Sequence, residues 1–238
     1  MFIDFRSQLV LPGTRRCVTR PQDYDPIVPR TSTSSRTLAD ENLNKPGHIR
    51  ADQRATTRVW ESELAAGDGL RNCHHALRSF SGELPPLAHL FDEAERIVHS
   101  VVIEDEDRLI FRRAFIHAHA LLNGHGLPVQ PLHGDAGLGN VLTGGVWHDW
   151  EDSSIGPIIW DLAALVSTAR ITGTRAQRAE ATLVAYGDDP GLDYLDAFVA
   201  LRGLQVLAWS LLVSTTERKM RSSTETRLRW FREYPWDD

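Results

Sequence analysis

Apolar residues recur at steps of three and four positions along two segments in the middle of the chain. In residues 87–101 the recurring positions are Leu87, Leu90, Phe91, Ala94, Ile97, Val98 and Val101. In residues 107–126 they are Leu109, Ile110, Ala114, Phe115, Ala118, Leu121 and Leu122. This period predicts two amphipathic helices that pack together, and Gly124 and Gly126 indicate where the second helix ends.

The pattern changes between residues 129 and 150. A short apolar run at 129–132 leads into a glycine-containing loop, and two further runs at 141–142 and 146–147 flank Gly144 and Gly145. Two short strands joined by a Gly-Gly turn are the expected structure.

After Pro157 the period is helical again. It predicts helices over residues 158–172, 174–186 and 192–214, and a last helix that begins near residue 222. The spacings Thr174 to Gln177 and Ser222 to Glu225 are typical of capping boxes at helix starts. The order of helices, one small hairpin and more helices predicts a mostly helical α+β fold.

Residues 1–58 differ from the rest of the chain. They contain five prolines, a Thr/Ser run at 31–35 and scattered arginines, with no sustained apolar period. We expect a poorly ordered or atypical N-terminal segment here, and a folded domain over residues 59–238.

Composition limits the class of protein. A chain of 238 residues, 42% of them hydrophobic, is long enough for one large globular domain. No apolar run predicts a membrane-spanning helix, and charges interrupt the N-terminus before a signal-peptide core forms, so we expect a soluble, cytoplasmic protein without a membrane partner. Two cysteines, Cys17 and Cys73, are too few for a disulfide framework or a four-thiolate zinc site.

Charge is distributed unevenly along the chain. Residues 1–58 carry 10 basic and 6 acidic side chains, whereas the remaining residues carry 16 and 26. An acidic body argues against a nucleic-acid partner and favours a cationic ligand. Nothing in the sequence indicates an oligomeric state.

The chemistry of the chain is concentrated in LHGDAGLGNVL, residues 132–142, and in the segment that follows it. Asp135 and Asn140 lie five positions apart on a glycine-containing loop, and Asp149 follows after the predicted hairpin. Phosphoryl transfer needs one carboxylate to orient an acceptor hydroxyl, and an amide oxygen and a second carboxylate to hold magnesium against nucleotide phosphates. The three residues are of the types, and in the order, that this reaction requires.

This stretch resembles the aminoglycoside phosphotransferase and choline kinase family. The family signature is His-Gly-Asp-x-x-x-x-Asn, a strand, an Asp-aromatic turn and then Gly-x-x-x-x-Asp-Leu-Ala. The matching positions are His133, Gly134, Asp135, Asn140, Asp149, Trp150, Gly156 and Asp161-Leu162-Ala163. Residues 80–235 resemble, more weakly, the helical C-terminal lobe of the protein-kinase-like fold, with its small catalytic β-hairpin.

The resemblance implies an ATP- and Mg²⁺-dependent O-phosphotransferase that acts on a hydroxyl of a small molecule. It implies that Asp135 is the catalytic base and that His133 braces the catalytic loop. Asn140 and Asp149 would bind the magnesium ion and, through it, the nucleotide. Asp161 would be a structural residue at the start of its helix.

Two features depart from the family pattern. Gly137 stands two positions after Asp135, where members often have a histidine. The larger departure is upstream of residue 80, where no Gly-rich loop is found and Lys45 lies beside a proline instead of in an apolar strand. We therefore expect the N-terminal lobe, which clamps the nucleotide in such kinases, to be lost or replaced.

This departure keeps two alternatives open. The first is a non-catalytic, pseudokinase-like lobe. The second is a metal-dependent hydrolase, with the metal held by His133, Asp135, His148 and Asp149.

Four other polar clusters have simpler interpretations. His117 and His119 would point to different faces of a helix, and Cys73-His74-His75 has no second ligand cluster at zinc spacing, so we expect no metal at either place. Residues 104–107 (EDED) are expected to be a solvated cluster at a helix start. Glu151 and Asp152 either face a cationic acceptor or cap and solvate their turn.

Overall fold

The computed structural model of the chain describes residues 51–124, 126–187, 190–215, 217 and 220–236. The chain divides into two compact units, Met1–Thr56 and Thr57–Asp238. In the first unit the described residues are 51–56, which are helical. Residues 1–50, which include Lys45, lie outside the described residues. The expectation that they are poorly ordered therefore stays a prediction.

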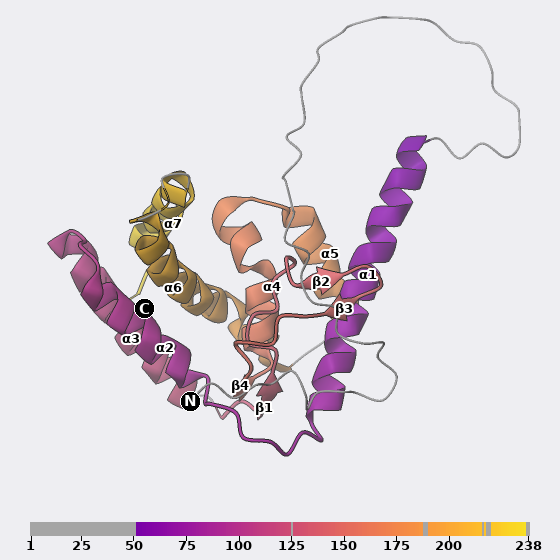
Figure 1. Cartoon of the computed structure of the whole chain (residues 1–238), viewed down its shortest axis with the longest axis horizontal. Helices are drawn as coiled ribbons and strands as arrows, with labels where there is room; N and C mark the ends of the chain where they lie inside the picture. Colours follow the sequence, from indigo (N-terminus) through magenta and orange to yellow (C-terminus); the bar gives the residue numbers. More distant parts are fainter. Residues whose placement is uncertain (1–50, 125, 188–189, 216, 218–219, 237–238) are drawn as a thin grey trace, which may run out of the picture. The chain divides into compact units, whose positions relative to one another are not determined.

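The second unit is mostly helical, as the sequence predicted (Figure 1). In chain order the elements are α1 (Ala51–Leu77), α2 (Ala88–Ser100), α3 (Asp105–Gly124), β1 (Val129–Leu132), β2 (Val141–Leu142), β3 (Val146–Trp147), β4 (Ser154–Pro157), α4 (Ile159–Thr172), α5 (Ala176–Tyr186), the 3₁₀ helix η2 (Pro190–Tyr194), α6 (Leu195–Ser214) and α7 (Arg221–Glu233).

Helix α6 lies at the centre of the helical packing. It contacts α2, α3, α4 and α7, and its contact with α4 is the most extensive (Figure 1). Both α4 and α6 are apolar on almost every side, because a helix enclosed by others has no face left for water. Phe198, Leu201 and Leu204 of α6 are fully buried in this core together with Leu162 of α4.

One segment is long and apolar enough to cross a membrane by its length and composition. It is Gly191–Ser214, which contains η2 and α6, with a mean hydropathy of 1.6. By length and composition alone, this segment differs from the prediction that no run of the chain spans a membrane. However, 61% of the segment's most apolar stretch is buried inside the protein, as in the central helix of a folded core.

Two small antiparallel sheets frame the segment that carries the motif. Strand β1 pairs with β4, with Leu132 opposite Ser154, and β2 pairs with β3 in the hairpin that the sequence predicted. Strand β4 was not predicted, because its sequence, Ser-Ile-Gly-Pro, contains a single β-branched apolar residue. Its pairing with β1, and a bridge from Pro86 to Ile155, supply the hydrogen bonds that extend it.

Helix α1 begins at Ala51, inside the segment that we expected to be loop up to residue 58. The helix is hard to predict because the face that it buries is made largely of small or polar residues. Between residues 62 and 77 the buried positions are Glu63, Ala66, Gly67, Leu70, His74 and Leu77. These positions follow the helical period, but only two of them are large and apolar.

The predicted capping boxes are not formed. Helix α5 is preceded by Arg175 in the left-handed conformation, with φ of 58°, so Thr174 lies outside the capping position. Helix α7 follows Met220, which places Ser222 inside its first turn. Neither helix has a side-chain cap hydrogen bond.

The acidic run at the start of α3 is only partly solvated. Glu104, Asp105 and Glu106 are exposed, as expected, but Asp107 is buried. Its carboxylate accepts hydrogen bonds of 2.6 and 2.7 Å from Arg232 of α7. This bidentate pair ties α3 to the last helix.

Close backbone approach joins α1 to the β2–β3 hairpin. A Cβ atom at Gly69 would lie 2.0 Å from the carbonyl oxygen of Gly145, and a Cβ atom at Gly145 would lie 1.9 Å from that of Ala65. The indole N–H of Trp147 donates a 3.0 Å hydrogen bond to the Ala66 carbonyl in the same contact. Glycine is therefore required at both positions if the helix and the turn are to touch.

Replacement of Gly69 by alanine should force α1 and the hairpin apart. We expect the free energy of unfolding to fall by about 1 to 3 kcal/mol, as for other overpacked sites, and thermal denaturation would measure it. Gly139→Ala is the matched control, because a Cβ atom there meets nothing within 4 Å. Equal stability of Gly69→Ala and wild type would contradict the close contact.

Candidate active site

The predicted catalytic loop follows β1 directly and begins with His133 and Gly134. Gly134 has a φ of 86°, and a Cβ atom at this position would lie 1.8 Å from the carbonyl oxygen of Asp152. Only glycine combines this backbone conformation with this contact. The loop is thereby pressed against the chain that returns towards β4.

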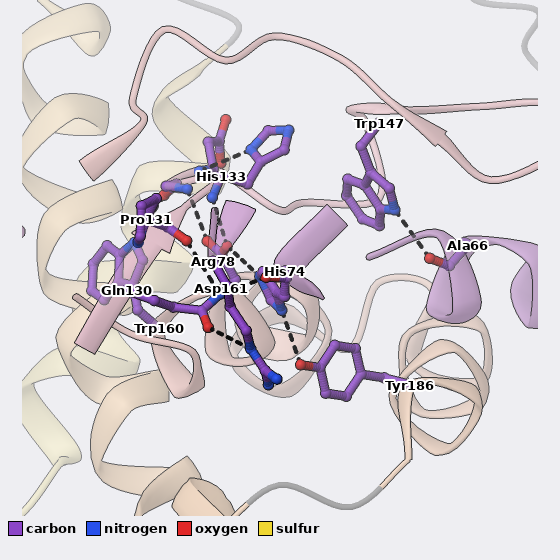
Figure 2. Close-up of polar contacts among 12 residues, drawn as sticks. Ala66, His74, Arg78, Gln130, Pro131, His133, Trp147, Trp160, Asp161 and Tyr186 are labelled. Carbon is purple, nitrogen blue, oxygen red and sulfur yellow. Dashed lines mark hydrogen bonds and ion pairs between the residues drawn. The ribbon is translucent and has the colours of Figure 1, made fainter. Parts of the chain in front are cut away.

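Asp161 fixes the start of the loop from below (Figure 2). Its fully buried carboxylate accepts hydrogen bonds from the backbone N–H groups of His133, at 2.8 Å, and Gly134, at 2.9 Å. The imidazole of His74 donates a third hydrogen bond, of 2.8 Å. Burial alone would raise the pKa of Asp161, but the hydrogen bonds from the His74 side chain and the His133 backbone hold the pKa below its usual value.

His133 links the loop to the hairpin. Its Nε2 donates to the backbone carbonyl of His148 at 2.9 Å, so Nδ1 is the acceptor for the Asp135 N–H at 3.3 Å. The ring packs against Trp147 and Trp150, with centroid distances of 5.7 and 4.5 Å. These are the contacts that a bracing residue would make, and they leave neither ring nitrogen free for a metal.

The carboxylate of Asp135 is held from two sides. The side-chain amide of Asn140 donates to its Oδ2 at 2.9 Å and to its backbone carbonyl, also at 2.9 Å. On the other side, the guanidinium of Arg202 forms an ion pair with Oδ1. The structure thus brings together the two predicted residues Asp135 and Asn140.

Arg202 was not among the predicted site residues. It lies in the middle of α6 and is buried, where it also donates to Gln205 at 2.6 Å and stands 5.4 Å from the ring centroid of Trp160. A charge in the middle of an apolar helix is the sequence signal that could have revealed it, because such a charge needs a buried partner.

Asn140 and Asp149, the predicted metal ligands, have suitable chemistry. Because the Asn140 amide nitrogen is committed to Asp135, its side-chain oxygen is left as an acceptor, and no described residue donates to it. Asp149 has an exposed carboxylate and a left-handed backbone with φ of 68°, which is rare for a residue other than glycine and is often found at functional sites. Amide and carboxylate oxygens are the ligands that magnesium prefers.

Asp152, three positions further on, is half-buried, whereas Glu151 is exposed. Burial raises the pKa of Asp152, and the nearby carboxylates of Asp135, Glu93 and Asp149 add to this effect, while Arg202 opposes it. Asp152 is therefore one of several acidic groups that act on one another at this end of the loop.

The histidine-rich metal site of the hydrolase alternative is not formed. Among the described residues, no group of three or more His, Cys, Asp or Glu side chains is arranged to hold a metal ion. His74, in the Cys-His-His run, is buried and bonded to Asp161 and Tyr186. The two lysines of the chain, Lys45 and Lys219, both lie outside the described residues.

Solved structures with a similar fold are choline kinase relatives. A choline/ethanolamine kinase family protein from Mesorhizobium loti aligns with a TM-score of 0.56 at 21% identity, over 77% of this chain and 66% of that one. Choline kinase LicA from Streptococcus pneumoniae aligns with a TM-score of 0.54 at 18% identity, over 75% of this chain and 66% of that one. The chain thus has the kinase-like fold of these proteins and spans just under two thirds of their length.

Sequence comparison points to the same group. No curated protein gave a significant match to the chain. The model of the phosphotransferase enzyme family matches residues 45–198, which include the catalytic loop, the hairpin and the buried aspartate that supports them. With well over half of the chain matched, this protein belongs to the phosphotransferase enzyme family.

Proposed function

We propose that the protein is an ATP- and Mg²⁺-dependent kinase that transfers a phosphoryl group to a hydroxyl of a small molecule. The observation that carries this proposal is the position of Asp135. Its carboxylate is fixed by Asn140 and Arg202, on a loop whose backbone is held by Asp161. In phosphoryl transfer most of the catalysis comes from such positioning and from stabilisation of charge.

In this mechanism Asp135 accepts a hydrogen bond from the acceptor hydroxyl and takes up its proton as the phosphoryl group is transferred. One oxygen of Asp135 is bonded to Asn140 and the other to Arg202, and each oxygen has a second lone pair for the hydroxyl. Asn140 and Asp149 would hold the magnesium ion. When bound, magnesium supplies positive charge beside the nucleotide phosphates.

We propose a cationic acceptor, such as an amino alcohol or an aminoglycoside. The carboxylates of Asp135, Glu93 and Asp149 all lie close enough to Asp152 to act on its charge, and the guanidinium of Arg202 opposes them. This acidic surrounding would attract an ammonium group. The structural neighbours are named as a choline/ethanolamine kinase family protein and a choline kinase, which is in line with this substrate class.

We also propose that residues 59–238 form the catalytic lobe and that the contacts to the nucleotide differ from those of a two-lobed kinase. The described residues contain no lysine, and Gly67 and Gly69 are packed against the backbones of Thr182 and Gly145, where they are not free to cover phosphates. The same observation favours the second candidate, a lobe without catalytic activity. Nucleotide binding separates the two.

Magnesium-ATP should raise the melting temperature of the wild-type protein. At 100 times the dissociation constant a ligand stabilises by about 2.7 kcal/mol, or about 5 to 10 °C for a chain of this size. Asp149→Asn keeps a residue that tolerates the left-handed backbone but removes the charge, so most of this shift should be lost. Glu151→Ala, in the same turn, is the control and should keep the shift, whereas no shift in the wild type would favour the non-catalytic lobe.

Asp135→Asn should abolish transfer while the protein stays folded, because asparagine still offers Arg202 an oxygen. We expect the rate of transfer from radiolabelled ATP to fall by at least about 100-fold, with the magnesium-ATP shift preserved. An acceptor panel of amino alcohols, aminoglycosides and neutral sugars would supply the substrate. Asp105→Asn, at an exposed position on α3, is the control; transfer by Asp135→Asn at the rate of this control would exclude the assigned role.

A further inference from the structure

His74 is remote in sequence from every motif residue, yet its side chain enters the network below the catalytic loop. It lies near the end of α1, 87 positions before Asp161, and is 1% exposed. Figure 2 shows its imidazole between Tyr186 of α5 and the Asp161 carboxylate, which in turn faces the start of the loop. Three segments of the chain thus meet at one buried ring.

The hydrogen bonds of His74 define its role as a donor to Asp161. An ionised carboxylate only accepts hydrogen bonds, so Nε2 of His74 carries the hydrogen of the 2.8 Å bond to Asp161. Nδ1 then accepts from the Tyr186 hydroxyl at 2.9 Å. The Asp161 carboxylate therefore fixes the tautomer of His74, and the Tyr186 hydroxyl bonds the remaining ring nitrogen.

The backbone around His74 is fixed to β1 as well. Gln130 donates from its side-chain amide to the His74 carbonyl at 2.9 Å, and Arg78 donates to Gln130 at 3.3 Å. The backbone of α1 at His74 is therefore anchored to β1, the strand that leads into the loop.

The hydrogen bond from His74 to Asp161 matters because the Asp161 carboxylate has no access to water. Its carboxylate is fully buried, and the described donors to it are His74 and the two loop N–H groups. A buried carboxylate that loses a donor is destabilised as an anion. On protonation, one oxygen would become a donor and would no longer hold its loop N–H group.

We propose that His74 is a positioning residue for the catalytic loop, which acts by keeping Asp161 charged and aimed at the N–H groups of His133 and Gly134. That the loop serves catalysis rests on the proposed function. The order of the loop, by contrast, depends on His74 whether or not the protein is an enzyme.

Hydrogen exchange followed by mass spectrometry on the full chain tests this directly. In His74→Phe, which fills the space but cannot donate, amides in peptides covering residues 132–140 should exchange at least about tenfold faster, while peptides from α6 stay within about twofold of wild type. In His74→Gln, whose amide nitrogen can reach Asp161, most of the protection should return.

Several hydrogen-exchange results for these variants would overturn the proposal. Equal acceleration of the loop and of α6 would make His74 an ordinary packing residue, as would unchanged loop exchange in His74→Phe. If His74→Phe does not fold, Tyr186→Phe replaces it. Loss of the hydroxyl should accelerate the loop more than α6, and a uniform or absent effect would again reject the proposal.

Failure of the proposed function would appear in nucleotide binding and not in hydrogen exchange. A wild-type protein that binds no magnesium-ATP but shows the loop-specific effect would retain the role of His74 and lose the kinase. In an active preparation, His74→Phe should lower kcat while the KM for ATP stays within about twofold, and His74→Gln should recover most of the rate. A rise in KM alone would contradict a positioning role.

Discussion

The buried carboxylate of Asp161 is the interaction on which the geometry of the site depends. It joins the first turn of α4 to the catalytic loop through two backbone N–H groups, and to α1 through His74. A charge without water is tolerated only where donors surround it. The loop that carries Asp135 and Asn140 contains no regular structure of its own, so its position depends on this anion, which is held between α1 and α4.

Much of the site and fold could be predicted from the sequence, because both the spacing of the motif and the apolar period of most helices are local properties. The long helices α2, α3, α4 and α6 have strong patterns, and Asp135 and Asn140 are five positions apart on one loop. Helix α1 could not be predicted from its period, since close contact with the hairpin requires small residues. Arg202, His74 and strand β4 depend on partners from 22 to 87 positions away, which local patterns do not contain.

Charge in this protein acts mainly through a few buried groups. The net charge of the whole chain is −6, but the groups that shape the site are an arginine inside an apolar helix and an aspartate inside a core. Both are held by opposite or donor groups on other elements, and both would be costly if they were left unpaired. The site is therefore specified by the same pairs that the fold needs for stability.

The pairing of Leu132 with Ser154 closes the ends of the segment that contains the catalytic loop and the hairpin. The segment is thus a long loop whose two ends are held together by the β1–β4 pair. Its position is fixed by that pair, by the hydrogen bonds to Asp161 and by the contact of Gly145 with α1. At Gly144, in the same turn, a Cβ atom would meet nothing within 4 Å, so this part of the turn is free of the contacts that hold Gly145. Since doubling the length of a flexible loop costs only about 0.6 kcal/mol, this turn can be lengthened without moving Asp135 and Asn140 on the adjoining loop.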